Sequence, residues 1–148
     1  MWREGFSFAL IGWLLNALAL AFGVLLGVRG LLDPNWAAKL VRLKPDEQGG
    51  GFAEFRATFG GLFLAAHGVA LFFSLNWIFG GAPVIGLFAA GAASVLCAAW
   101  AGTAGGRALS MLRDKTWTQF NLISVGVELF VAALIGAPWA FWSVSSPG

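Results

Sequence analysis

Four long apolar runs constrain the fold of this 148-residue chain more than any other feature. They extend from Phe6 to Val28, from Phe55 to Phe79, from Pro83 to Ala104 and from Gln119 to Trp142. A helix needs about 20 residues to cross a hydrocarbon core about 30 Å thick, and each run reaches that length. Because the runs do not alternate, and because lipid-exposed backbone must satisfy its own hydrogen bonds, helices are predicted rather than strands. We therefore expect an all-α integral membrane protein, a four-transmembrane-helix bundle forming one transmembrane domain over residues 1–148.

Composition narrows the class of protein further. Hydrophobic residues make up 59% of the chain and charged residues only 11%, which lies far outside the range of soluble globular domains. Nine basic and seven acidic residues give a formal net charge of +2, and Cys97 is the single cysteine. These values exclude a disordered chain, a nucleic-acid-binding protein and a secreted disulfide scaffold.

The distribution of cations predicts the orientation of the spans. Eight of the nine basic residues lie in or beside two connections, between the first two runs and between the last two: Arg29, Lys39, Arg42, Lys44, Arg56, Arg107, Arg113 and Lys115. Only Arg3 lies on the other side. Since cytoplasmic loops carry the excess of Lys and Arg, we predict a multi-pass protein of the bacterial inner membrane with both termini in the periplasm.

The first of these connections contains the pattern of a short amphipathic helix. Asp33-Pro34 is typical of an N-cap followed by proline at the first helical position, and Trp36, Leu40 and Leu43 then share one face. We predict a short cytoplasmic interfacial helix over about residues 34–43, with its leucines at the acyl boundary and its cations at anionic lipid head groups. The glycines at 49–51 predict a flexible joint after it.

Glycines at helical spacing mark surfaces where helices pack closely. Gly23-x-x-x-Gly27 and Gly102-x-x-x-Gly106 each place two small residues about one turn apart. We expect them to pack within the bundle. Homodimerisation and docking to another membrane protein are the alternatives.

Ionisable side chains inside a membrane are costly, at about 2.5 to 3.5 kcal/mol each on the insertion scale, so their positions are informative. Glu54 and Arg56 open the second run, Arg107 closes the third, and Glu128 stands inside the fourth. At about 1.5 Å per residue, Glu128 and His67 reach roughly 15 to 18 Å from the cytoplasmic ends, close to the midplane. The other three lie near the interface.

Two polar stripes follow from the helical period of 3.6 residues. On the second run, one quadrant holds Arg56, Gly60, Phe63 and His67. On the fourth run, one face holds Asn121, Ser124 and Glu128. Together they predict a polar seam within the bundle, which could contact a bound lipid or quinone, with Arg56 and Arg107 at its mouth.

Several interpretations of the deep residues stay open at this point. His67 is expected to be a core histidine bonded to a carbonyl or hydroxyl, with pairing to Glu128 or axial ligation of a haem or pigment as alternatives. Glu128 is expected to be structural, either protonated or paired with Arg56 or Arg107, and otherwise a proton relay or ligand contact. No metal site or cofactor is predicted, because the second histidine and second cysteine that zinc prefers are missing. No catalytic motif is present in the sequence.

The segment Glu54-Phe55-Arg56-Ala57-x-Phe59-Gly60-Gly61 resembles the opening of the second helix in the domain-of-unknown-function 4345 family of small bacterial membrane proteins. The resemblance continues through Gly106-Arg107, with Asp114 after it, and through Val127-Glu128-Leu129. It covers most of the chain from about residue 54 onward and implies a small four-helix protein, but the family name carries no activity. The resemblance singles out six positions: Glu54, Arg56, Gly60, Gly61, Arg107 and Glu128. We expect its two adjacent glycines to be close-packing residues, whereas His67 is not part of the pattern.

Two functional hypotheses from different classes follow. The first is a non-catalytic four-helix membrane subunit or accessory protein that docks onto a larger inner-membrane complex, respiratory or photosynthetic. The second is a small membrane protein that binds or transfers a lipid or quinone through the seam at His67 and Glu128. A membrane oxidoreductase ranks third. In each case the expected partners are membrane lipids and another integral membrane protein, with no nucleic acid.

Overall fold

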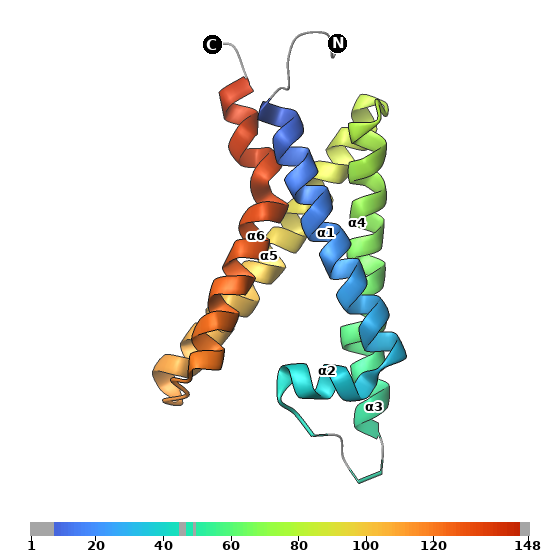
Figure 1. Ribbon diagram of the computed structural model, residues 1–148. Coiled ribbons are helices and arrows are strands. Elements are labelled where there is room, and N and C mark those ends of the chain that lie inside the picture. The colour runs from blue at the N-terminus through green and yellow to red at the C-terminus, as the bar shows by residue number, and fades with distance from the viewer. Residues whose placement is uncertain (1–7, 45–46, 49, 146–148) are drawn as a thin grey trace. The chain divides into compact units, whose positions relative to one another are not determined.

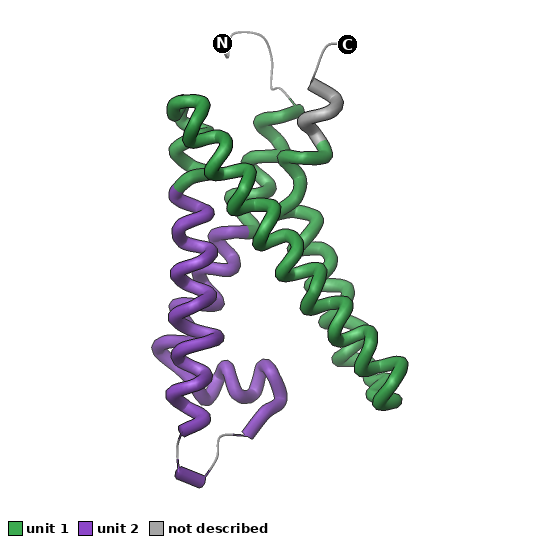
Figure 2. Tube along the Cα trace, turned by 180° about the vertical axis from the view of Figure 1, so that it is seen from behind, with its two compact units in different colours: residues 1–19, 73–148 green, residues 20–72 purple. Residues whose placement is uncertain are grey.

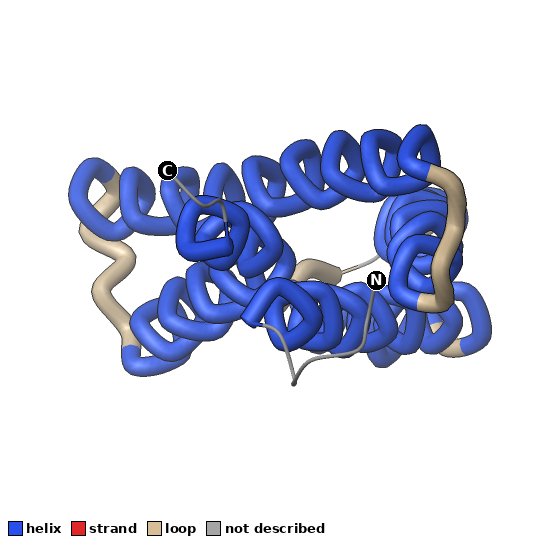
Figure 3. The backbone as a smooth tube through the Cα atoms, turned by 90° about the horizontal axis from the view of Figure 1, so that it is seen from above, coloured by secondary structure: helices blue, strands red, loops and turns tan. Residues whose placement is uncertain are grey.

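The computed structural model describes residues 8–44, 47–48 and 50–145, and the side chains among them up to residue 140 (Figure 1). Within these ranges the chain is helical, with no strand (Figure 3). The helices, in chain order, are α1 (Phe8–Leu32), α2 (Pro34–Val41), α3 (Gly50–Glu54), the π-helix η1 (Phe55–Leu62), α4 (Phe63–Ile78), α5 (Pro83–Arg113) and α6 (Gln119–Ser145). The predicted start at Phe6 lies outside the described residues.

Four helices are long and apolar enough to cross a membrane. They are α1, α5, α6 and a continuous helix, Gly50–Ile78, that joins α3, η1 and α4. The four predicted runs each correspond to one of them.

Several predicted boundaries need correction. The first helix continues past Val28 to Leu32, where it ends because Asp33 precedes a proline and takes an extended conformation. The third continues past Ala104 to Arg113, since a helix needs apolar residues only where it meets lipid or protein. Gly50 and Gly51 are helical, so the flexible joint predicted over all three glycines is wrong at these two; Gly49 lies outside the described residues.

The chain divides into two compact units (Figure 2). Unit 1 comprises Met1–Ala19 and Phe73–Gly148, and unit 2 comprises Leu20–Phe72. Unit 1 thus holds the first part of α1, the end of α4, and the α5–α6 hairpin. Unit 2 holds the rest of α1 with α2, α3, η1 and most of α4.

The core of unit 1 contains small residues and aromatic rings. Ala89 and Ala90 of α5 are buried beside Trp13 of α1, and the rings of Trp13 and Trp77 meet edge to face with centroids 6.4 Å apart. Alanines let helices approach closely, and the tryptophans fill the remaining space.

Tight turns join the long helices of unit 1. The α4 helix ends at Ile78, and Gly80 in the following turn has a φ of +92°, which suits glycine. The Gly81 amide then donates to the Asn76 carbonyl at 2.8 Å. Pro83 then opens α5 at a position where its missing N–H is not needed. At the other end, Thr118 Oγ1 accepts from the amide of Asn121 and starts α6.

In unit 2, α2 packs against η1. Asp33 caps the helix by accepting from the Trp36 amide at 3.0 Å, as the Asp-Pro pair predicts. The helix ends at Val41 rather than near residue 43, because Arg42 turns left-handed with φ +60°. Its buried residues Ala37 and Ala38 form a cluster with Phe55 of η1, a contact that the sequence analysis did not predict.

The π-helix η1 was also not predicted. It occupies eight residues at the start of the second long helix and begins a ladder of rings spaced four residues apart. Phe55, Phe59, Phe63 and His67 follow one another with centroids 6.0, 6.4 and 5.0 Å apart. Longer π segments are rare and mark places where packing overrides the regular helical hydrogen bonds. Here the ladder lies along the side of the helix that also carries the Phe55 contact to α2.

Candidate functional site

The best-defined polar site lies in unit 1, between α5 and α6. Arg107 faces Glu128, with Nη2 2.7 Å from Oε1 and Nε 3.1 and 3.2 Å from the two carboxylate oxygens. The Glu128 side chain is only 8% exposed, and that of Arg107 is 30% exposed. The planar guanidinium matches the carboxylate at two points, which is the geometry that best compensates a buried charge.

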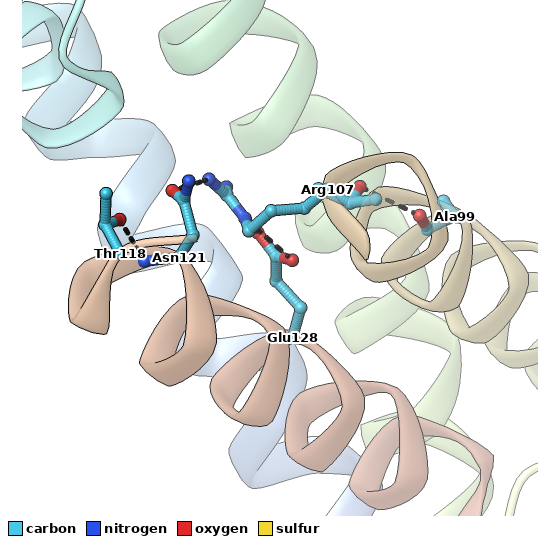
Figure 4. A network of polar contacts seen from close by, with 6 residues as sticks. Ala99, Arg107, Thr118, Asn121 and Glu128 are labelled. Atoms are coloured by element: carbon cyan, nitrogen blue, oxygen red, sulfur yellow. Dashed lines mark hydrogen bonds and ion pairs between the residues drawn. The ribbon is translucent and has the colours of Figure 1, made fainter. Parts of the chain in front are cut away.

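Asn121 extends this ion pair into a network (Figure 4). It lies two turns before Glu128 on α6, and its Oδ1 accepts from Arg107 Nη1 at the longer distance of 3.5 Å. Its Nδ2 donates to the carbonyl of Thr116 in the α5–α6 connection at 2.7 Å. Arg107 is therefore held between two α6 side chains, and the connection is tied to the same site.

Ser124 is the third member of the stripe predicted on α6. It is half-buried, and within the described part of the chain it makes no side-chain hydrogen bond to Arg107 or Glu128. The network thus contains Asn121 and Glu128 but not Ser124.

The other predicted site residues lie in unit 2 and have separate surroundings. His67 is 2% exposed, donates from Nδ1 to the Phe63 carbonyl at 2.9 Å and stacks on the Phe63 ring. A Cβ added at Gly23 of α1 would collide with the imidazole, including its Nε2 edge. Ligation of a haem or pigment by Nε2 would require α1 to move away, so the packing favours the interpretation of His67 as a core histidine.

Arg56 stabilises the end of α1. It is exposed, and its Nε donates to the carbonyl of Leu31 at 3.1 Å, in the last turn of that helix, where carbonyls lack intrahelical donors. Gly60 makes this approach feasible, because a Cβ there would lie 2.8 Å from the backbone nitrogen of Leu31. Glu54, exposed at the end of α3, takes no part in this contact.

The predicted close-packing glycines fall into two groups. Gly23, Gly27 and Gly60 each lie against another helix of unit 2, and Gly30, which was not singled out, continues the row with a Cβ position 2.5 Å from the Phe59 carbonyl oxygen. Gly61 would meet only the carbonyl of Arg56 in its own helix, at an ordinary 3.6 Å.

The second group needs a correction. A Cβ at Gly102 or Gly106 of α5 would meet no neighbouring atom within 4 Å among the described residues. The spacing is right for close packing, but among the described residues no helix of unit 1 supplies a small-residue face opposite these glycines.

Sequence reasoning missed one buried polar cluster. Asn16 of α1 is fully buried in unit 1, where its Nδ2 donates to the Ile135 carbonyl of α6 at 2.7 Å. Its Oδ1 accepts from the buried hydroxyl of Ser74 in α4 at 2.8 Å. The signal was an amide in the middle of an apolar run, where an unsatisfied polar group is costly.

The described part of the chain contains no group of three or more His, Cys, Asp and Glu side chains that could hold a metal ion. Comparison with protein-family models, with curated proteins and with solved structures finds no match to this chain.

The polar side chains described above do two things chemically. Arg107 neutralises the buried Glu128 carboxylate between α5 and α6. Arg56 and Asn16 donate hydrogen bonds to backbone carbonyls of α1 and α6.

Proposed function

We propose that the chain is a multi-pass protein of a bacterial inner membrane and acts as a non-catalytic subunit or accessory protein of a larger membrane complex. Four helices long and apolar enough to span support the first part. Large apolar side chains also point outward from them, including Leu18 at 67% and Phe130 at 63% exposure. Surfaces of this kind suit lipid or a protein partner rather than water. The distribution of cations supports periplasmic termini.

The main support for a docking role is an open face on helix α5. Residues on this face fall within about 100° of arc at the helical period. In chain order they are Gly91, Val95, Ala98, Gly102, Gly105, Gly106 and Leu109. Added Cβ atoms at the four glycines would meet nothing within 4 Å among the described residues, while Val95 and Leu109 are 69% and 58% exposed. Small residues flanked by larger apolar ones are the surface that transmembrane helices use for mutual packing.

The ion pair between α5 and α6 supports a structural role rather than catalysis. The two-point contact with Arg107 compensates the Glu128 charge and holds the carboxylate in place between the two helices. The pair also fixes the register of α5 against α6, and so the direction in which the open face points.

The docking proposal is tested in the native membrane by extraction in mild detergent and native gel electrophoresis. The wild-type chain is expected to comigrate with a larger complex, and Gly102→Leu is expected to release it as a small species. Gly126→Leu is the matched control, because Gly126 of α6 also has nothing within 4 Å of its Cβ position. Equal migration of both variants with the complex would overturn the use of this face.

Orientation is tested separately with reporter fusions. Fusions after Lys44 and Lys115 should report the cytoplasm, and one after Ser146 should report the periplasm. A cytoplasmic C-terminus would contradict the proposed topology. Membership of the domain-of-unknown-function 4345 family stays a proposal that rests on the quoted motifs.

Binding of a lipid or quinone is the second candidate function. It is supported by the half-buried network at Arg107, Asn121 and Glu128, which offers polar groups that a head group could contact. Organic extraction of the purified protein distinguishes the two roles: a monomer that retains lipid or quinone in stoichiometric amount would favour this candidate over docking.

A further inference from the structure

Helix α2 has three different faces. The first is buried against η1: Pro34, Ala37 and Ala38 are inaccessible, and the two alanines pack with Phe55. The second is polar and exposed, with Asn35 and Lys39. These two faces leave a third, apolar side of the helix, which the protein covers only at Trp36, beside the alanine cluster.

This third face consists of Trp36 and Leu40, with Leu43 just beyond the helix end. Leu40 is 45% exposed and Leu43 60% exposed, whereas an ordinary surface helix buries its leucines against the core. At 100° per residue the three faces of α2 are centred about 120° apart. The helix therefore presents small residues, polar residues and large apolar residues to three separate surroundings.

Within unit 2, α2 also runs crosswise to the adjoining end of α1 and to the start of the second long helix, formed by α3 and η1 (Figure 1). If those two helices cross a membrane, a helix lying across their ends runs along the membrane surface. A helix in that position at the edge of a bundle meets protein on one side, water on another and acyl chains on the third. The three faces of α2 match these three media.

We propose that α2 is a docking surface for anionic phospholipid, with Leu40 in the acyl region and Lys39 at the phosphates. This inference rests on the proposed membrane insertion and adds the ligand class and the residues that bind it. Charge complementarity identifies the lipid as anionic, because residues 34–44 contain three cations, Lys39, Arg42 and Lys44, and no acid.

A fourth cation, which belongs to α1, contacts the same helix α2. The Arg29 guanidinium of α1 lies 4.8 Å from the Trp36 ring centroid, a cation–π contact that fixes a positive charge at the border of the apolar face. Asp33, the acid that precedes α2, uses its Oδ1 to cap the helix. An acidic protein would neutralise the cations but would leave Leu40 and Leu43 without an apolar partner, so a lipid surface accounts for more of the geometry.

Spin-label accessibility tests this placement on the full chain. Single cysteines at Asn35, Leu40 and Phe130, in a Cys97→Ala background, are labelled after reconstitution into vesicles of phosphatidylcholine and phosphatidylglycerol. We expect oxygen to relax the labels at Leu40 and Phe130, and a water-soluble nickel complex to relax the label at Asn35. Phe130 is the control, because it is exposed on α6, one of the four helices long and apolar enough to cross a membrane.

The outcomes separate this inference from the proposed function. Nickel relaxation at Leu40 with oxygen relaxation at Phe130 would overturn the placement of α2 and leave membrane insertion intact. Nickel relaxation at both positions would overturn membrane insertion itself.

The lipid selectivity of the chain tests whether the cations of α2 bind an anionic head group. Native mass spectrometry of the detergent-solubilised chain, titrated with phosphatidylglycerol and phosphatidylcholine, should show preferential retention of phosphatidylglycerol. Lys39→Gln and Lys44→Gln should each reduce that preference by about fivefold, the value for one cation near an anionic surface. Glu47→Gln is the control and should not reduce it. An unchanged preference in the Lys39→Gln, Lys44→Gln double variant would overturn the assignment of an anionic lipid.

Discussion

The Gly23-x-x-x-Gly27 pair of unit 2 and the Gly102-x-x-x-Gly106 pair of unit 1 have the same spacing, yet their surroundings are opposite. A Cβ at Gly27 would collide with the backbone of Leu64, whereas one at Gly106 would meet no neighbouring atom within 4 Å among the described residues. The comparison shows that spacing alone does not make a close contact. The facing helix must supply a matching surface.

The two regions also use different interactions to hold their helices. In unit 2, α1 approaches η1 and α4 through glycines, so dispersion between close backbones carries the contact. In unit 1, α5 and α6 are joined by the Arg107–Glu128 ion pair and by the bonds of Asn121. Lipid offers little driving force for apolar helices to associate, so helices in a membrane depend on close packing or on polar contacts between them.

The largest expected effect comes from adding one methyl group to the glycine-packed region. Gly60→Ala would place a Cβ 2.8 Å from the Leu31 backbone nitrogen, and we expect it to lower the free energy of unfolding by about 3 kcal/mol. Gly61→Ala, one residue later, meets only an ordinary contact and should change it by less than about 0.5 kcal/mol. Reversible unfolding in mixed micelles measures both. Equal losses would remove the packing argument.

Breaking the ion pair should have the next largest effect. Arg107→Ala leaves the Glu128 carboxylate buried without its partner, and we expect a loss of about 2 kcal/mol, moderated because Arg107 is 30% exposed. Arg113→Ala is the control at the exposed end of α5, with a loss below about 0.5 kcal/mol. Thermal unfolding in detergent compares the two. Indistinguishable melting would contradict the role assigned to the pair.

A smaller loss is expected from the cluster that links α1, α4 and α6. Asn16→Ala leaves the Ile135 carbonyl and the Ser74 hydroxyl without this partner, and we expect a cost of about 1.5 kcal/mol. Ser94→Ala removes only a bond to the Ala90 carbonyl in the preceding turn of its own helix and should be close to neutral. Unfolding free energies again distinguish them, and a neutral Asn16→Ala would show that the cluster does not hold these helices together.

The smallest effect should follow from Glu128→Gln. The amide keeps nearly the shape of the carboxylate and one acceptor for Arg107, so the expected loss is less than about 1 kcal/mol. Any function of an associated complex should persist at normal protein levels. A loss of that function with unchanged abundance of the chain would instead identify Glu128 as a titrating or ligand-contacting residue.

The presence and approximate position of the four long helices could be predicted, because apolar run length and the constraint on backbone hydrogen bonding act locally along the sequence. Their ends could not, because a helix can continue beyond its apolar run. For the partner of Glu128, the sequence leaves Arg56, Arg107 and His67 open, because the choice depends on which helices become neighbours. Arg107 is chosen because α6 packs beside α5 as an antiparallel hairpin (Figure 1). The other arginine, Arg56, belongs to unit 2 and bonds the end of α1 instead.

The π-helix and the Asn16 cluster were not predicted, for physical reasons of the same kind. No residue pattern distinguishes the π-helix at Phe55–Leu62 from an α-helix, because its hydrogen bonds depend on the packing of the rings and of Gly60. A buried polar contact of Asn16 could have been predicted, since a lone amide in an apolar span implies a hydrogen-bond partner. Its partners could not be identified, because Ser74 and Ile135 lie far away in sequence.

The central claim is that one glycine spacing packs internally in unit 2 and is left open on α5 in unit 1. The most direct test compares the unfolding free energies of Gly27→Ala and Gly106→Ala in the same detergent, with helical content checked by circular dichroism. We expect Gly27→Ala to lose about 3 kcal/mol, and Gly106→Ala to be neutral or slightly stabilised by the higher helix propensity of alanine. A loss at Gly106→Ala as large as that at Gly27→Ala would contradict the account.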